Sequence, residues 1–242
     1  MPASSGIGNH LLEFHRSGTA VDIDRMLLMS QPVKRTYRAD KRAQTAEATR
    51  AAIRAAAGEL FIESGYAATT MREVARRAGV GERTLYDTFP NKLELFRHTI
   101  GVATVGDEEP VAVLDRPEVL AAFDEVDPLT AVTRVVEYTA GLFERAGDLI
   151  MVGIEAGAAD AGMKAGSEAG AEHTYQFWLG LTRNLFRVDA LRPELDAESA
   201  ADIAFALGSP HVFRLLRRQR GWAATRYREW LTGAVTAQLL RE

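Results

Sequence analysis

Cysteine is absent from this chain of 242 residues. Its absence excludes disulfide scaffolds, thiol catalysis, iron–sulfur clusters and zinc fingers. Long apolar runs are missing as well, because the longest, Leu149 to Ile154, is far shorter than the about 20 residues that a membrane span needs. The N-terminus has no cationic start followed by an apolar run, so we expect no secretory signal. The sequence therefore predicts a cytoplasmic protein with no membrane partner.

Motifs of the common enzyme and metal sites are also missing. The five histidines are scattered, and no two of them have the spacing of a metal-binding pair: His10, His15, His98, His173 and His211. No HExxH, GxSxG or Walker sequence occurs, and Gly79-Val80-Gly81 follows a helical pattern rather than a strand. We expect a protein that is not an enzyme and that uses neither a cofactor nor a metal.

What the chain contains is an ordinary globular composition with an uneven distribution of charge. Residues 34–97 hold 13 Lys and Arg against 8 Asp and Glu, whereas residues 98–242 hold 14 against 22. This asymmetry favours a polyanionic partner for the basic part, although a solvated surface can have the same composition. Lys34-Arg35, Arg38 and Lys41-Arg42 form a basic arm, which is typical of a phosphate-contacting tail.

Residues 1–33 have no clear hydrophobic period and contain two internal methionines, Met26 and Met29. A start at Met29 would place the basic arm directly after Met-Ser-Gln-Pro. Residues 1–28 are thus expected to be either a disordered extension or sequence upstream of the true start.

Almost all of the remaining chain has a helical period, which predicts an all-α fold. An apolar stripe runs from about Gln44 to Ser64, and Gly65 follows in the position that a left-handed helix end prefers. Thr70 then begins a capping box with Glu73, which predicts a second, short helix.

A glycine turn separates this short helix from the next. Gly79-Val80-Gly81 precedes a third helix over residues 82–89, and Pro90-Asn91 precedes a fourth from about Lys92. Helices joined by such a turn in a basic stretch predict a helix-turn-helix motif, although a plain helical hairpin has the same spacing.

The third helix has one inward and one outward face. Leu85 and Phe89 lie four residues apart and are expected to face inward. The outer face then carries Glu82, Arg83, Thr84, Tyr86 and Asp87. Arginine can bind guanine, threonine can contact a thymine methyl group, and tyrosine can bind a phosphate.

These same residues resemble the DNA-binding domain of the tetracycline-repressor (TetR) family. The resemblance extends from Thr49 to near Ile100 without gaps. Its signature residues are Leu60-Phe61-Ile62-Glu63-Ser64-Gly65-Tyr66-Ala67-Ala68-Thr69-Thr70, Val74-Ala75, Ala78-Gly79-Val80, Thr84-Leu85-Tyr86, Phe89 and Asn91-Lys92.

The resemblance implies a homodimeric transcriptional regulator, usually a repressor released by a small ligand. It implies an N-terminal three-helix helix-turn-helix domain at residues 43–100, with the motif at about 70–89. A C-terminal helical domain for ligand binding and dimerisation would occupy residues 101–242, and residues 1–42 would be an N-terminal extension.

DNA contacts follow from the same resemblance. Thr70 and Met71 would meet the DNA backbone at the start of the second helix, and Tyr86 and Lys92 would clamp phosphates. The positions that would read bases are Arg83, Thr84, Asp87 and Thr88.

Two residues depart from the family pattern. Gly81 stands where Ser or Thr often opens the recognition helix, and glycine caps less well than a hydroxyl. Asp87-Thr88 stands where an aromatic or basic residue is frequent. An acid there weakens the attraction to phosphate but can accept a hydrogen bond from cytosine N4.

Further helices are expected beyond residue 101, separated by an acidic connector at 104–128 and a glycine-punctuated segment at 153–170. The glycines can allow close helix packing, but a flexible connector is the favoured interpretation. The expected helices lie at about 118–125, 132–145, 147–156, 172–186 and 200–208 and at the C-terminus.

Aromatic and methionine side chains in these helices either form core or line a ligand cavity. With Tyr138 and His173 as polar groups, such a cavity would suit a hydrophobic or aromatic ligand. The candidate pocket residues are Tyr138, Phe143, Met151, His173, Phe177 and Trp178.

The resemblance implies a dimer interface formed by the last two long helices of each subunit. A single seam in the last helix suits it, although an intramolecular core face has the same spacing. Dimerisation would fix two recognition helices about 34–36 Å apart, as a palindrome requires. The candidate interface residues are Phe205, Phe213, Tyr227, Trp230, Leu231, Ala234 and Gln238.

The expected function is that of a homodimeric regulator released from a palindromic DNA operator by an unknown small-molecule effector. Two alternatives remain at this point. One is a helical small-molecule-binding dimer or scaffold whose DNA head has weakened, and the other is an activator on the same kind of site.

Overall fold

The computed structural model describes residues 33–107, 109 and 111–241, so the expectations for residues 1–28 lie outside the described residues. The chain divides into two compact units, Met1–Ala46 and Glu47–Glu242. The described part of the first unit is the beginning of helix α2 (Val33–Ala68), where Thr45 Oγ1 donates to the carbonyl oxygen of Lys41 at 2.8 Å. Helix α2 is longer than predicted because no proline or glycine interrupts it between Val33 and Ala57.

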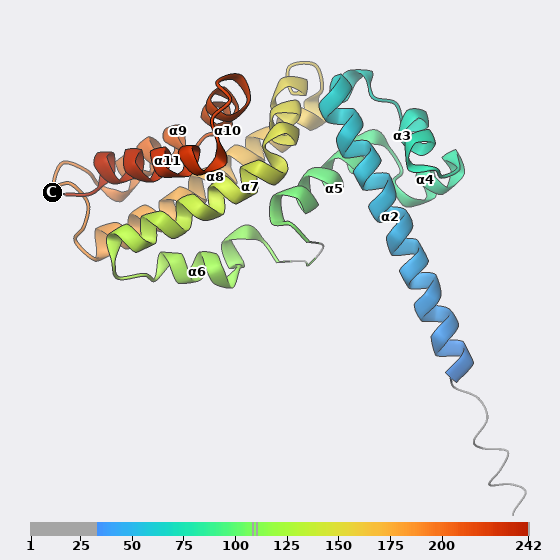
Figure 1. Cartoon of the computed structure of the whole chain (residues 1–242), viewed down its shortest axis with the longest axis horizontal. Coiled ribbons are helices and arrows are strands. Elements are labelled where there is room, and N and C mark those ends of the chain that lie inside the picture. The colour runs from blue at the N-terminus through green and yellow to red at the C-terminus, as the bar shows by residue number, and fades with distance from the viewer. Residues whose placement is uncertain (1–32, 108, 110, 242) are drawn as a thin grey trace, which may run out of the picture. The chain divides into compact units, whose positions relative to one another are not determined.

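The three helices that follow α2 begin where the sequence predicts. Thr70 caps the first of them through the capping box with Glu73, and Gly79 ends it with a φ of 69°. Asn91 caps the third through its side chain. These helices are α3 (Met71–Ala78), α4 (Glu82–Thr88) and α5 (Lys92–Val105), labelled in Figure 1.

The rest of the described chain is helical and, apart from an isolated bridge between Leu191 and Leu240, contains no strand pairing, which confirms the all-α fold. None of its helices combines the length and apolar character of a bilayer span. Its elements are η1 (Val113–Asp115), α6 (Pro117–Phe123), α7 (Pro128–Ala156), α8 (Ala161–Arg187), α9 (Ala197–Leu207), α10 (Pro210–Phe213), the π-helical turn η2 (Arg214–Gln219) and α11 (Ala224–Leu239).

The predicted break near Gly147 is wrong, because α7 runs through it as one helix. A β-carbon at residue 147 would lie 2.9 Å from Cε1 of Phe213. Gly147 therefore makes room for a neighbouring ring rather than ending a helix.

The predicted flexible connector at 153–170 is wrong as well. Helix α8 starts at the N-cap Asp160 and continues through Gly162, Gly166 and Gly170. Gly162 fits against Leu93 of α5, since a β-carbon there would lie 2.6 Å from Cδ2 of Leu93. The close-packing interpretation is thus the correct one for Gly162.

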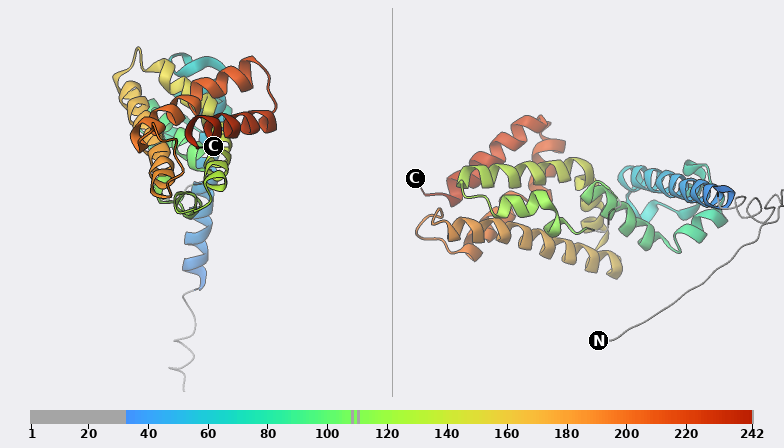
Figure 2. Two further views of the ribbon diagram at one scale, coloured as in Figure 1. Left: turned by 90° about the vertical axis from the view of Figure 1, so that its left-hand side faces the viewer. Right: turned by 90° about the horizontal axis from the view of Figure 1, so that it is seen from below.

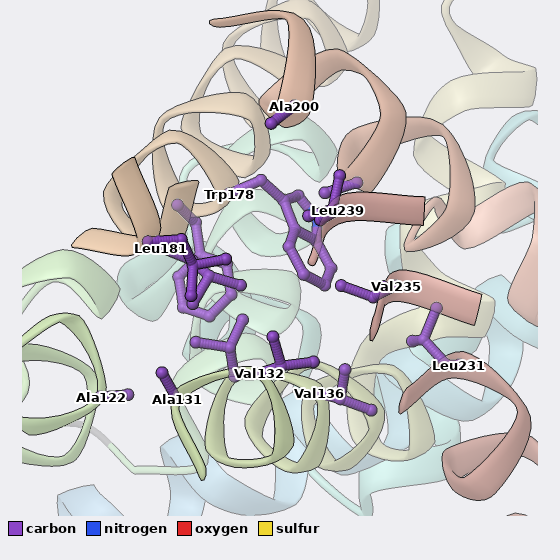
Figure 3. Close-up of a cluster of buried hydrophobic side chains, with 14 of the residues drawn as sticks. Ala122, Ala131, Val132, Val136, Trp178, Leu181, Ala200, Leu231, Val235 and Leu239 are labelled. Atoms are coloured by element: carbon purple, nitrogen blue, oxygen red, sulfur yellow. The ribbon is translucent and has the colours of Figure 1, made fainter. Parts of the chain in front are cut away.

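Two hydrophobic cores organise the unit Glu47–Glu242. The first contains residues of α2, α3, α4 and α5 and also includes Leu149 of α7 and Met163 of α8. The second surrounds Trp178, with Val132 and Val136 of α7 on one side and residues of α11 on the other (Figure 3). Helices α7 and α8 lie alongside each other in every view (Figures 1 and 2) and carry residues of both cores.

Candidate functional site

Helix α4 has one buried and one exposed face. Leu85 and Phe89 are buried in the first core, as the sequence predicts. Arg83, Thr84 and Asp87 are exposed, and half of the Tyr86 surface is accessible. Thr88 is half-buried, and its hydroxyl donates to the carbonyl oxygen of Thr84 at 2.7 Å. Polar groups of α4 that can hydrogen-bond are thus presented to solvent on a short, fixed helix.

Ion pairs on this face are long and solvated. Arg83 Nε lies 3.8 Å from Asp87 Oδ2, and both side chains are more than two-thirds exposed. Arg72 Nε of α3 lies 3.5 Å from Glu82 Oε1 of α4, and both of these side chains are more than half exposed. Such pairs contribute about 0–1 kcal/mol, so their arginines can exchange partners readily.

The start of α3 is fixed by reciprocal hydrogen bonds. Thr70 N and Oγ1 both donate to Glu73 Oε2, and Glu73 N donates to Thr70 Oγ1. The Thr70 side chain and backbone hold the pKa of the Glu73 carboxyl below its usual range. The Met71 side chain is buried, so the DNA contact predicted at this residue would use its backbone N–H.

Lys92 performs a structural role that the sequence does not reveal. Its Nζ donates to the carbonyl oxygens of Tyr66 at 2.8 Å, Ala67 at 3.3 Å and Thr69 at 3.0 Å, and it lies 4.5 Å from the centre of the Tyr66 ring. Burial lowers the pKa of the Lys92 ammonium. All three ammonium protons are therefore engaged at the end of α2, and a phosphate contact would have to replace one of these bonds.

Arg72 and Arg76 are exposed cations of α3 that the sequence analysis missed. They lie four residues apart and share one helix face, which is the signal that could have identified them. Arg77 differs, since its Nη1 donates to both oxygens of Glu63 at 2.8 and 2.9 Å and ties α3 to α2.

The six predicted pocket residues lie in different surroundings in the described part of the chain. Four of them, Phe143, Met151, Phe177 and Trp178, are buried, and His173 is exposed. Tyr138 alone of the six lines a described cavity, which has a volume of about 460 Å³. The other residues around that cavity are Val105, Gly106, Asp107, Arg116, Glu118, Glu137, Gly141 and Arg145.

The predicted dimer residues separate into two groups. Phe213, Tyr227 and Leu231 have no accessible surface within a single chain, so they belong to its own core and cannot contact a partner directly. This burial also raises the pKa of the Tyr227 hydroxyl. Accessible surface remains on Phe205, Trp230, Ala234 and Gln238.

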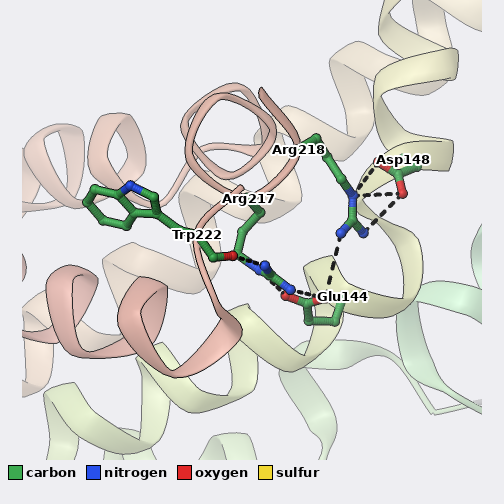
Figure 4. A network of polar contacts seen from close by, with 5 residues as sticks. All are labelled: Glu144, Asp148, Arg217, Arg218 and Trp222. Carbon is green, nitrogen blue, oxygen red and sulfur yellow. Dashed lines mark hydrogen bonds and ion pairs between the residues drawn. The ribbon is translucent and has the colours of Figure 1, made fainter. Parts of the chain in front are cut away.

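A network of ion pairs attaches η2 to α7 (Figure 4). Arg217 donates to Glu144 through Nε at 2.6 Å and Nη2 at 3.1 Å, and also to the carbonyl oxygen of Trp222. Arg218 Nε donates to both oxygens of Asp148 at 3.1 Å. The π-helical turn is therefore held against α7 by charged groups of the chain itself.

Most residues of the first core lie in a segment that matches a known protein family. Residues 53–99 match the family described as bacterial regulatory proteins, tetR family. Over 88 residues the chain is 38% identical to the HTH-type transcriptional repressor BepR of Brucella suis biovar 1, covering 36% of this chain and 39% of BepR. Over 41 residues it is 51% identical to the HTH-type transcriptional activator FasR of Mycolicibacterium smegmatis, covering 17% of this chain and 19% of FasR. The matches thus span about two fifths or less of these curated relatives.

The fold similarity extends much further along the chain. The crystal structure of native NalD, the secondary repressor of the MexAB-OprM multidrug efflux pump in Pseudomonas aeruginosa, superposes with a TM-score of 0.60 at 23% identity. The superposition covers 81% of this chain and 99% of NalD. Residues 53–99, which include the capped α3–α4 motif, thus match the tetR family of bacterial regulatory proteins, and the superposition shows that the chain shares the fold of NalD.

Proposed function

We propose that the chain is a transcriptional regulator that binds double-stranded DNA through α3 and α4. The exposed face of α4 carries the proposal. This face presents Arg83, Thr84 and Tyr86 to solvent, whereas Leu85 and the capping residue Phe89 are buried. A short helix of this kind can enter the major groove, where arginine binds guanine and threonine or tyrosine complete the contacts. The free backbone N–H groups at the start of α3 and the Arg72 side chain are suited to phosphates.

The direct test is binding to the DNA upstream of its own gene over a series of salt concentrations. We expect Arg83→Ala to weaken specific binding about 10- to 100-fold, the effect of losing one good base contact. Arg228→Ala is the matched control, because Arg228 is an exposed arginine of α11. Equal binding by the parent and Arg83→Ala on a selected operator would contradict the proposed role of α4.

The regulator is proposed to act as a homodimer on a palindromic operator. Ala234 keeps accessible surface beside the buried stripe of α11, whereas Thr225 lies on another, exposed face of that helix. Ala234→Arg is expected to shift the chain towards monomers in sedimentation experiments, and Thr225→Arg is expected to leave its mass unchanged. A monomeric parent, or two variants with identical mass, would overturn this interface.

We also propose that a small ligand binds in the cavity beside Tyr138 and thereby releases the regulator from the DNA. Repression is the first candidate because the longer curated match is named a repressor, and activation is the second because FasR is named an activator. A reporter fused to the operator distinguishes them, since deletion of the regulator raises expression in the first case and lowers it in the second. None of the three relatives is named as an enzyme, which supports the prediction of a protein that is not one.

A further inference from the structure

Three elements line an open depression of about 460 Å³, which we call the polar cavity. The end of α5 and its turn contribute Gly106 and Asp107, and the start of α6 contributes Arg116 and Glu118. Glu137, Gly141 and Arg145 lie on one face of α7 at successive intervals of four residues. Most of the lining side chains are therefore charged, unlike those of the aromatic pocket expected from the sequence.

Two buried polar atoms of the lining have no hydrogen-bond partner among the described residues. Arg116 is 8% exposed, and its Nη1 and Nη2 each donate to a different oxygen of Asp107 at 2.8 Å, but its Nε is unpaired. Tyr138 Oη is buried and unpaired in the same way. Unpaired buried polar groups are destabilising by about 1–3 kcal/mol each, and a bound ligand or an ordered water would satisfy them.

Arg145 adds a charged donor. Its Nε and Nη2 donate to the carbonyl oxygens of Ala103 and Thr104 at 3.4 and 3.1 Å, and no described carboxylate forms an ion pair with it. Its guanidinium fits between two glycines, because β-carbons at residues 106 and 141 would each lie 3.4 Å from one of its nitrogens. Nη1, the atom nearest Gly141, is left to bind an acceptor.

We propose that the polar cavity binds a small organic acid with a single carboxylate, which accepts hydrogen bonds from Arg145 and the Tyr138 hydroxyl. Because Arg116 is paired with Asp107, Arg145 is the cation that can compensate a ligand carboxylate, and Glu118 and Glu137 would repel any further negative charge. They favour a ligand whose remaining part is neutral or cationic. Burial raises the pKa of the Tyr138 hydroxyl, which keeps it a donor at neutral pH.

Binding there would act on the DNA-binding helices through α5. Arg145 holds the last carbonyl groups of α5, whose first residue, Lys92, fixes the end of α2 beside α3. A carboxylate that draws Arg145 away would loosen the end of α5, and this regulatory consequence rests on the DNA-binding function proposed above. Binding of the acid itself does not depend on that function.

The test compares three probes with the same ring: benzoate, benzyl alcohol and benzylamine. Their binding to the full chain is measured by ¹H–¹⁵N NMR, with the amides of Gly106 and Gly141 as reporters of the polar cavity. We expect benzoate to bind at these amides at least about tenfold more tightly than the other two probes, as a charge-assisted contact should.

Variants separate recognition from folding. Arg145→Gln is expected to weaken benzoate binding at least about tenfold, and Arg228→Gln is expected to have no effect. Because Arg145→Gln also removes bonds to α5, Tyr138→Phe provides the second variant. It removes a buried unpaired hydroxyl, so it should weaken benzoate binding a few-fold, by about 3- to 10-fold, while thermal stability stays equal or rises.

Benzoate binding no tighter than benzyl alcohol, shifts confined to other amides, or unchanged binding in both Arg145→Gln and Tyr138→Phe would overturn the proposal. A parent that binds benzoate at the polar cavity but no selected DNA would instead contradict the proposed DNA-binding function alone. The two failures are therefore distinguishable in one set of samples.

Discussion

Two exposed arginines of the helix-turn-helix region and two buried arginines of the C-terminal region make opposite kinds of contact. In the helix-turn-helix region, Arg72 and Arg83 form only long ion pairs, and their side chains are 86% and 95% exposed. In the C-terminal region, Arg116 and Arg217 form short bonds to carboxylates of the chain, and their side chains are 10% and 15% exposed. Arg72 and Arg83 are therefore available to a partner such as DNA, whereas Arg116 and Arg217 stabilise the fold.

Glycine shows a parallel difference. Gly65 and Gly79 in the helix-turn-helix region have φ values of 79° and 69°, so the first bends α2 near its end and the second ends α3. In the C-terminal region Gly180 makes room for a ring, since a β-carbon there would lie 2.6 Å from Cε2 of Phe123. Local backbone conformation therefore shapes the first region, and the fit between distant side chains shapes the second.

The largest effect is expected at Gly208. A β-carbon at this position would overlap Cζ2 of Trp178, which is fully buried in the second core. Gly208→Ala should therefore lower the free energy of unfolding by about 3 kcal/mol, the upper part of the range for overpacking. Denaturant unfolding of the full chain measures the loss.

Gly166 provides the matched control for this substitution. It lies inside α8, and no atom would lie within 4 Å of an added β-carbon. Gly166→Ala should therefore stabilise the chain by about 0.5–1 kcal/mol through helix propensity. Similar losses in both variants would show that tertiary fit does not distinguish the two glycines.

The second prediction concerns Arg217. Its bonds to Glu144 and to the carbonyl oxygen of Trp222 are largely screened from water, so Arg217→Gln should destabilise the chain by about 2 kcal/mol. DNA affinity per folded molecule is expected to stay unchanged. Arg183→Gln, which breaks an ion pair of 3.6 Å between exposed side chains, should change stability by less than about 0.5 kcal/mol. Equal losses would remove the contrast between buried and solvated arginines.

The third prediction concerns the cap of α3. Thr70→Ala removes the acceptor of the Glu73 N–H and should reduce stability by about 1 kcal/mol. The loss should appear in hydrogen exchange of the α3 amides, with little change in the amides of α11. Thr70→Ser retains the hydroxyl and is the matched control. Equal effects of both variants on α3 exchange would show that the cap hydroxyl is not what holds this helix.

These differences explain how much could be predicted from the sequence. The helix-turn-helix region was predictable because its boundaries depend on neighbouring residues, such as the capping box of Thr70 with Glu73. The α7 and α8 helices were divided wrongly because Gly147 and Gly162 read as breaks. In the structure, glycine is needed at these positions because Gly147 packs against Phe213 and Gly162 against Leu93. These partners lie about 65 to 70 residues away in the sequence.

The candidate sites follow the same division. The outer face of α4 was predictable from the four-residue spacing of Leu85 and Phe89. The polar cavity was not, because its residues come from α5, α6 and α7 and meet only in the folded chain. The role of Lys92 was hidden for the same reason, since its three carbonyl partners lie 23 to 26 residues earlier.

The smallest expected effect separates two roles of Asp87. In the free chain its carboxylate lies 3.8 Å from Arg83 Nε, and both side chains are exposed to solvent. If Asp87 only competes with DNA for Arg83, then Asp87→Asn should raise operator affinity about two- to fivefold, because a negative charge is removed from the interface.

Affinity measured by fluorescence anisotropy at several salt concentrations tests this, with Glu229→Gln on α11 as the exposed-acid control. A loss of affinity that is confined to operators with one particular base pair would show instead that Asp87 accepts a hydrogen bond from a cytosine amino group. In that case Asp87 contributes to sequence specificity. Carboxylates would then show the same contrast as arginines, with exposed ones available to DNA and buried ones bonded within the chain.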